Sequence, residues 1–243
     1  MGLEGLTQLE ILQGIVGLIS LGISFIVAFK IISKYFTYKR PELITVGLMM
    51  LFVTSGWWGS ALAFIMYVVF NLELSDFFYI FISYGFVSLS SIFWLYSFAY
   101  LVYPKSKWKI LSVWLAISIL YTILFIYYIL IDPSVLAIRI TRFDTETRYF
   151  VAGYILLSLL ISLITQAIFL KGSISSKDKR IRWKGKFIFL GFSIFLIGAV
   201  LDSVVPLTSI TLLITRILLI TSSIVSYIGW IMPERVANWL VKE

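Results

Sequence analysis

Residues 171–205 read KGSISSKDKRIRWKGK and then FIFLGFSIFLIGAVLDSVV, which is a dense basic segment followed by a long apolar run. As a helix, the apolar part is long enough to cross about 30 Å of hydrocarbon. The same alternation of apolar runs and short polar gaps extends along the whole chain. Seven runs predict seven transmembrane helices, at residues 11–33, 43–69, 77–103, 110–131, 149–170, 187–205 and 207–232.

The composition agrees with a chain that lies mostly in lipid. Of its residues, 60% are hydrophobic and 13% are charged, against about 25% charged in an average soluble domain. Backbone groups in hydrocarbon must be paired within their own segment, and these runs are continuous rather than short and alternating, which favours helices over a β-barrel. We therefore expect an all-α, multi-pass protein of the cell membrane, with a seven-helix bundle over residues 1–233.

The charges in the gaps predict the orientation of the bundle. The first, third and fifth gaps are basic, whereas the second and fourth are acidic or balanced and the sixth is a tight turn at Pro206. By the positive-inside rule, the odd-numbered gaps face the cytoplasm, so the N-terminus is outside and the C-terminus inside.

Two smaller elements are expected. Residues 234–243 resemble a short amphipathic helix on the inner leaflet, with a disordered tail as the alternative, and residues 136–141 suggest an external hairpin or a plain loop.

The residue types that are missing narrow the chemistry. The chain has no Cys and no His, which removes thiolate sites and the commonest metal ligand. No lysine lies within the sixth or seventh run to hold retinal, and we expect no metal, no cofactor and no enzymatic activity. The net charge of +8 is better explained by anionic lipid headgroups than by nucleic acid.

One charge lies deep within an apolar run and marks a candidate site. Arg216 is about 13 Å inward from the predicted outer end of the seventh run, at 1.5 Å per residue. A charge at that depth is expected to face the bundle interior and to find a partner. The nearest candidate is Asp202, on the antiparallel sixth helix. We expect an ion pair that either pins the two helices together or lines a pocket for an anionic or polar ligand.

Other polar and aromatic residues are predicted to surround this pair. Trp57 and Trp58 fall near the middle of the second run, and Ser90 of the third run lies at a depth suited to accept an indole N–H. Ser83 and Ser90 recur at a seven-residue step, which returns to nearly the same helix face. With Tyr84, these residues are candidates for a cavity that opens outward, although a packed bundle core has the same composition.

The fifth gap is the candidate surface for docking. It is expected to contact anionic lipid, or a cytoplasmic protein partner, through Lys177, Lys179, Arg180, Arg182, Lys184 and Lys186. Spans one to three and five to seven also share weak features, which suggests a 3+1+3 repeat like that of some transporters.

The whole plan resembles rhodopsins and G-protein-coupled receptors in architecture, although the receptor motifs are replaced, as at Phe98-Ala99-Tyr100. Residues 94–105 and 227–235 are similar to the seven-helix sensory regions of some archaeal and bacterial histidine kinases and to free-standing archaeal homologues. The resemblance implies a receptor-like or sensory protein that binds a small molecule or lipid and signals through a separate partner. The alternatives are a small-solute transporter, although the Pro-Gln signature of SWEET-type carriers is absent, and a membrane scaffold.

Overall fold

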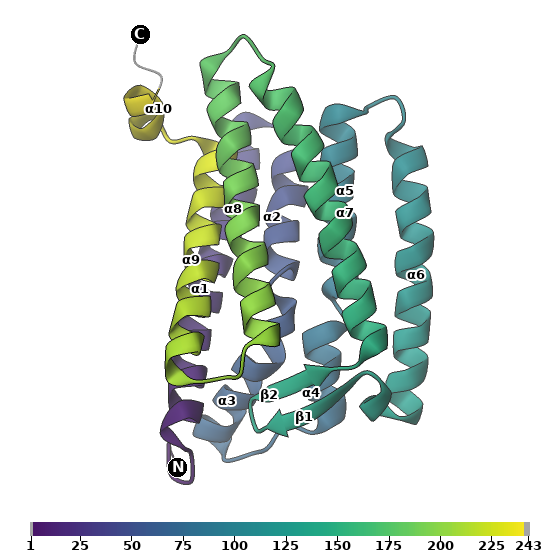
Figure 1. The fold of residues 1–243 in the computed structure, drawn as a ribbon, viewed down its shortest axis with the longest axis vertical. Coiled ribbons are helices and arrows are strands. Elements are labelled where there is room, and N and C mark those ends of the chain that lie inside the picture. The colour runs from purple at the N-terminus through teal and green to yellow at the C-terminus, as the bar shows by residue number, and fades with distance from the viewer. Residues whose placement is uncertain (1, 241–243) are drawn as a thin grey trace.

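The computed structural model describes residues 2–240, and within them seven helical spans are long and apolar enough to cross a membrane (Figure 1). The predicted number of crossings is confirmed, and the chain is a multi-pass integral membrane protein. Five spans are single helices, α1 (Gln8–Tyr38), α6 (Lys107–Ile131), α7 (Tyr149–Ile174), α8 (Lys179–Val204) and α9 (Ser209–Ile231).

The other two spans are broken near their middle. The second consists of α2 (Glu42–Phe52), the 3₁₀ turn η1 (Ser55–Trp57) and α3 (Trp58–Phe70). The third consists of α4 (Asp76–Tyr84) and α5 (Val87–Val102), and η1 packs against α4. At both breaks the backbone tightens to bonds between residues i and i−3, from Trp57 N–H to the Thr54 carbonyl and from Leu89 N–H to the Phe86 carbonyl. The Tyr121 hydroxyl donates to the carbonyl of Tyr84 at the second break (3.1 Å), which keeps that carbonyl paired inside the bundle.

The largest difference from the predicted boundaries is at the sixth span. Helix α8 begins at Lys179, eight positions before the predicted start at residue 187, because its first two turns contain the basic residues. The side chain of Asp178 caps this helix by accepting from the backbone N–H of Arg180 (2.7 Å). Hydropathy reports where hydrocarbon begins, whereas a helix continues into the polar region as long as its backbone bonds are satisfied.

The helices form a bundle in which the first and last spans are neighbours. Helix α1 packs against α2 and α9, α9 against α8, α8 against α7, and α5 against α2, α6 and α7. Figure 1 shows the N-terminus and the two strands at one end of the bundle and α10 (Glu234–Leu240) at the other. We call these the hairpin end, formed by residues 2–7, 71–75, 132–148 and 205–208, and the basic end, formed by residues 39–41, 103–106, 175–178 and 232–240.

A β-hairpin closes part of the hairpin end, which is one of the two expected structures. After the short turn η2 (Pro133–Val135), β1 (Ala137–Thr141) pairs antiparallel with β2 (Asp144–Thr147). Its turn residue Phe143 is 1% exposed and packs edge-on against Phe64, with ring centroids 5.5 Å apart. Gln13 Nε2 (3.0 Å) and the Tyr79 hydroxyl (2.8 Å) both donate to the carbonyl of Phe143. The hairpin is therefore fixed to the first, second and third spans.

At the basic end, α10 is a helix of seven residues beside the bundle (Figure 1). Ala237 is buried on one side, whereas Trp239 is 76% exposed on the other. An exposed indole beside the end of a membrane span is typical of residues at the headgroup level. Residues 241–243 of the predicted amphipathic segment lie outside the described residues.

Candidate functional site

The expected ion pair between the last two spans is present in the hairpin half of the bundle. Arg216 Nη1 lies 2.9 Å from Asp202 Oδ1, and the two side chains are 5% and 15% exposed. Both residues lie within spans, so the pair replaces the water that each charge loses in lipid. A pair of opposite charges this well buried binds α8 to α9 as well as forming a polar centre in the bundle.

Two further donors complete the shell of the Asp202 carboxylate. Trp57 Nε1 donates to Oδ2 (2.6 Å), and Thr215 Oγ1 donates to Oδ1 (3.0 Å), so each carboxylate oxygen accepts a hydrogen bond. The Arg216 guanidinium also lies over the ring of Trp57, 5.6 Å from its centroid. The second span thus joins the last two spans at the point where it breaks, because Trp57 is the last residue of η1.

The expected role of Ser90 as the indole acceptor was wrong. Trp57 reaches Asp202 instead, and Trp58 Nε1 donates to Thr54 Oγ1, four positions earlier in its own span (3.2 Å). The reason is the break at η1, which turns the two indoles away from the directions that a continuous helix would give them. Ser90 is half-buried on α5.

Ser83 and Tyr84 lie at the end of α4 and face different neighbours. Tyr84 is buried, and its hydroxyl shares a hydrogen bond with Thr145 Oγ1 of the hairpin (2.8 Å). Ser83 is fully buried and lies so close to Gly59 that a Cβ on that glycine would be 2.1 Å from Ser83 Oγ. Of the predicted site residues, Trp57, Asp202 and Arg216 form one bonded cluster, whereas Trp58, Ser83 and Tyr84 contact Thr54, Gly59 and Thr145.

Four buried polar atoms in this half of the bundle have no hydrogen-bond partner among residues 2–240. They are Ser55 Oγ, Ser83 Oγ, Arg139 Nε and Arg216 Nε. Leaving such groups unpaired costs about 1–3 kcal/mol each, and more for a charged group. The Asp202 carboxylate is thus fully bonded, whereas Arg216 keeps one donor for a further acceptor.

The hairpin carboxylate Asp144 lies close enough to this cluster to feel its charges. Burial raises the pKa of Asp144 above its ordinary value, the backbone N–H of Thr145 opposes that rise, and the negative charge of Asp202 adds to it. The positive charge of Arg216 lowers the same pKa. The hairpin and the polar cluster are therefore electrostatically coupled.

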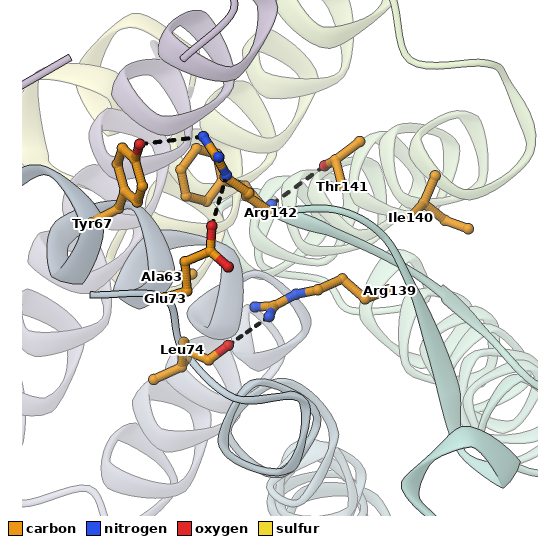
Figure 2. A pocket seen from close by; sticks show the side chains of 9 residues that line it. Ala63, Tyr67, Glu73, Leu74, Arg139, Ile140, Thr141 and Arg142 are labelled. Carbon is orange, nitrogen blue, oxygen red and sulfur yellow. Dashed lines mark hydrogen bonds and ion pairs between the residues drawn. The ribbon is translucent and has the colours of Figure 1, made fainter. Parts of the chain in front are cut away.

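Two pockets at this end lie beside the hairpin. A pocket of about 340 Å³ is bounded by β1, the hairpin turn and the link between α3 and α4 (Figure 2). A second pocket of about 290 Å³ lies on the other side of Arg139, towards Asp132 and Asp76. The first pocket is lined by Ala63, Tyr67, Glu73, Leu74, Arg139, Ile140, Thr141, Arg142 and Phe143.

Two arginines of the hairpin define the polar side of the first pocket. Arg142 Nε lies 2.9 Å from Glu73 Oε1, while its Nη1 donates to the carbonyl of Gly5 (2.9 Å) and to the Tyr67 hydroxyl (3.3 Å). Arg139 Nη1 donates to the Leu74 carbonyl and contacts Asp76 Oδ1 at 3.2 Å. Figure 2 shows the Glu73 carboxylate pointing toward the Arg142 guanidinium, with their ion pair drawn as a dashed line.

These pocket residues were not identified from the sequence, because hydropathy locates the spans and does not predict how the loops between them fold. The charges of the two gaps were nevertheless an indication that their side chains pair. The second gap contains only acidic charges, Glu73 and Asp76, whereas the fourth contains Arg139 and Arg142. Both gaps lie at the same end of an antiparallel bundle, so opposite charges in them are natural partners.

At the basic end, half of the predicted docking residues turn back onto the protein. Arg180 Nη2 donates to the Met232 carbonyl (3.1 Å), Lys184 Nζ to the Trp230 carbonyl (3.4 Å), and Arg182 Nη1 to the Ser176 carbonyl (2.9 Å). The first two cover carbonyls at the C-terminus of α9, where helices favour cations. Lys177, Lys179 and Lys186 are exposed, and Lys186 lies 4.6 Å from the centroid of the Trp183 ring.

No protein-family model matches the chain, and a comparison with curated proteins finds no match.

Proposed function

We propose that this protein is a receptor-like sensor of the cell membrane, which binds a small polar or anionic molecule in the hairpin half of its bundle. The observation that carries the proposal is the Arg216–Asp202–Trp57 cluster, where a buried guanidinium keeps an unpartnered Nε beside a broken span. A donor held ready in a low-dielectric bundle binds an incoming acceptor strongly. Trp58, Tyr84, Ser83 and Ser90 belong to the same half, and the role is non-enzymatic.

The hairpin end faces outward in this proposal, and the basic end faces the cytoplasm. The basic gaps support this orientation through the positive-inside rule. A ligand then arrives from outside, while Lys177, Lys179 and Lys186 remain exposed for anionic headgroups or a cytoplasmic partner. Signal output passes through that separate partner.

A small-solute transporter is the second candidate, and the two broken spans favour it. Discontinuous helices in transporters place unpaired backbone groups and helix ends at a substrate site near the bilayer midplane. In this chain, η1 and the interruption between α4 and α5 supply such helix ends within the second and third spans. The two candidates differ in access, because a transporter exposes its site to water from both sides in turn.

Single-cysteine labelling separates the two functions, since the chain has no Cys of its own. Ser60→Cys and Ser90→Cys place a thiol on each broken span, and both positions are half-buried. Ser75→Cys and Ser175→Cys, exposed at the hairpin and basic ends, report the side that a membrane-impermeant reagent reaches. A sensor predicts labelling of the span thiols from the hairpin side alone. Labelling from both sides contradicts it and supports transport.

The docking role of the basic end has its own test. Lys177→Gln, Lys179→Gln and Lys186→Gln together remove exposed charges, and we expect the purified protein to retain less phosphatidylglycerol with unchanged thermal stability. Lys184→Gln is the comparison, because that side chain covers the Trp230 carbonyl and its loss lowers stability. Equal lipid retention by the triple variant and the original chain would remove the lipid role.

A further inference from the structure

The pocket between β1 and the α3–α4 link contains an arginine, Arg142, with several contacts besides its acidic partner Glu73. Arg142 Cζ lies 4.9 Å from the centroid of the Tyr67 ring, and Arg142 Nη1 donates to Gly5 and Tyr67. These contacts position the guanidinium in addition to its ion pair with Glu73. An arginine positioned in this way presents a preorganised fork, formed by two N–H groups of its guanidinium, to a carboxylate.

Glu73 occupies the carboxylate position beside this fork. Its side chain is 62% exposed and belongs to the non-helical link between α3 and α4, whereas the Arg142 side chain is 39% exposed. An ion pair with such exposure is weak and exchanges readily with water. Glu73 is therefore the partner of Arg142 that is most easily displaced.

The remaining walls suit a small apolar body attached to a carboxylate. The apolar lining residues are Ala63, Leu74, Ile140 and Phe143, and Thr141 and Arg139 add polar groups to the lining. The volume of about 340 Å³ falls at the small end of ligand pockets, which are mostly apolar with a few convergent polar groups. Glu73, Leu74 and the hairpin residues of the lining lie outside the candidate spans, whereas Ala63 and Tyr67 lie near the end of the second.

We propose that this pocket binds a small water-soluble monocarboxylate, whose carboxylate displaces Glu73 from Arg142 while its apolar part lies against the apolar lining of the pocket. Glu73 then acts as a resident competitor that weakens binding until a ligand replaces it. The inference goes beyond the proposed function, because this pocket at the hairpin end contains none of Trp57, Asp202 and Arg216.

The test measures binding directly, using benzoate as the probe and benzyl alcohol as its uncharged counterpart. The full chain is placed in nanodiscs of zwitterionic lipid, and dissociation constants are obtained by ligand-observed NMR. Glu73→Gln removes the competitor and is expected to tighten benzoate binding about two- to fivefold, the range for an exposed ion pair. Arg142→Gln is expected to weaken binding about tenfold or more, with Arg142→Lys in between.

Two control variants match these changes outside the pocket. Glu146→Gln and Arg148→Gln alter exposed charges of the same region, and we expect both to leave benzoate binding unchanged. The gain for Glu73→Gln keeps the test independent of folding, because a damaged protein does not bind more tightly. Unchanged or weaker binding by Glu73→Gln, or equal binding of benzyl alcohol and benzoate, overturns the proposal. Because the thiol-labelling experiment reports access and not affinity, a failure there is distinguishable from a failure here.

Discussion

Trp57 and Asp202 lie 145 positions apart in the chain, and a hydrogen bond of 2.6 Å joins the indole Nε1 to the carboxylate Oδ2. The bond connects the broken second span to the sixth at the level of the Arg216 ion pair. It gives the buried carboxylate a donor from a third helix, so that neither oxygen depends on Arg216 alone. The break in the second span and the polar cluster are thus one structural unit.

The first prediction concerns this hydrogen bond. Trp57→Phe keeps an aromatic ring beside Arg216 but removes the donor, and we expect the free energy of unfolding to fall by about 1.5–3 kcal/mol, as for a bond to a charged group. Trp58→Phe is the matched control, because its indole donates to the neutral Thr54 hydroxyl and its loss costs only about 0.5–1.5 kcal/mol. Reversible unfolding of both variants in mixed micelles gives the comparison. Equal losses would mean that the charge of Asp202 adds nothing.

The second prediction concerns the ion pair itself. Arg216→Met leaves the Asp202 carboxylate without its cation, and we expect a loss of roughly 3–5 kcal/mol in unfolding free energy. Adding Asp202→Asn to Arg216→Met removes the orphaned charge and should recover part of that loss. A double-mutant cycle measures the coupling between the two residues. Strict additivity of the two single losses would show that the pair makes no net contribution.

Much of the fold was predictable from the sequence because lipid imposes a length and a composition on each span. The spacing of Arg216 and Asp202 on antiparallel neighbours was sufficient to predict their pairing, since a charge in hydrocarbon must find a partner. Helix α7, for example, begins where predicted, at Tyr149.

Breaks and loops were not predictable in the same way. The apolar character of residues 43–69 continues through η1, so nothing in hydropathy marks the turn that directs Trp57 to Asp202 instead of Ser90. The pocket was missed for a related reason. Most of its residues come from the second and fourth gaps, and their pairing depends on how the hairpin packs against α3. The helical period of 3.6 residues, from which spans are predicted, contains no information about that packing.

The third prediction concerns the anchor of the hairpin. Phe143→Ala removes a ring that is 1% exposed, and truncating a buried Phe costs about 3–5 kcal/mol. We expect faster backbone hydrogen exchange over residues 137–147, measured by mass spectrometry, with the spans less affected. Ile140→Ala is the control, because that side chain belongs to the same hairpin and is 57% exposed. Unchanged exchange in Phe143→Ala would show that the hydrogen bonds from Gln13 and Tyr79 are sufficient to hold the turn.

The fourth prediction concerns the close approach of the second and third spans. A Cβ on Gly59 would lie 2.1 Å from Ser83 Oγ and 2.8 Å from the backbone carbonyl of Tyr79. Gly59→Ala must therefore push α3 away from α4, and we expect a loss of about 1–3 kcal/mol. Gly153→Ala on α7 has open space around the new methyl group and is expected to be neutral or to stabilise by up to about 1 kcal/mol. The melting temperatures of the two variants, measured in the same detergent and buffer, test this difference. Equal changes in melting temperature would contradict the tight α3–α4 contact.

The fifth prediction concerns the dependence of stability on pH. Burial raises the pKa of Asp144 above 3.8 in the folded chain, so the folded state binds a proton more tightly than the unfolded state does. The unfolding free energy therefore falls as pH rises from about 3.8 to the raised pKa, and the cost of the buried charge persists above it.

Asp144→Asn retains an oxygen for the Thr145 N–H but has no charge. We expect this variant to be more stable than the original chain at neutral pH, and to lose the part of the pH dependence that lies in that window. Glu146→Gln, on the exposed face of the same strand, should leave the profile unchanged. A pH series of melting temperatures measures both variants, and an Asp144→Asn profile that follows the original chain would show that this carboxyl group is not the one responsible.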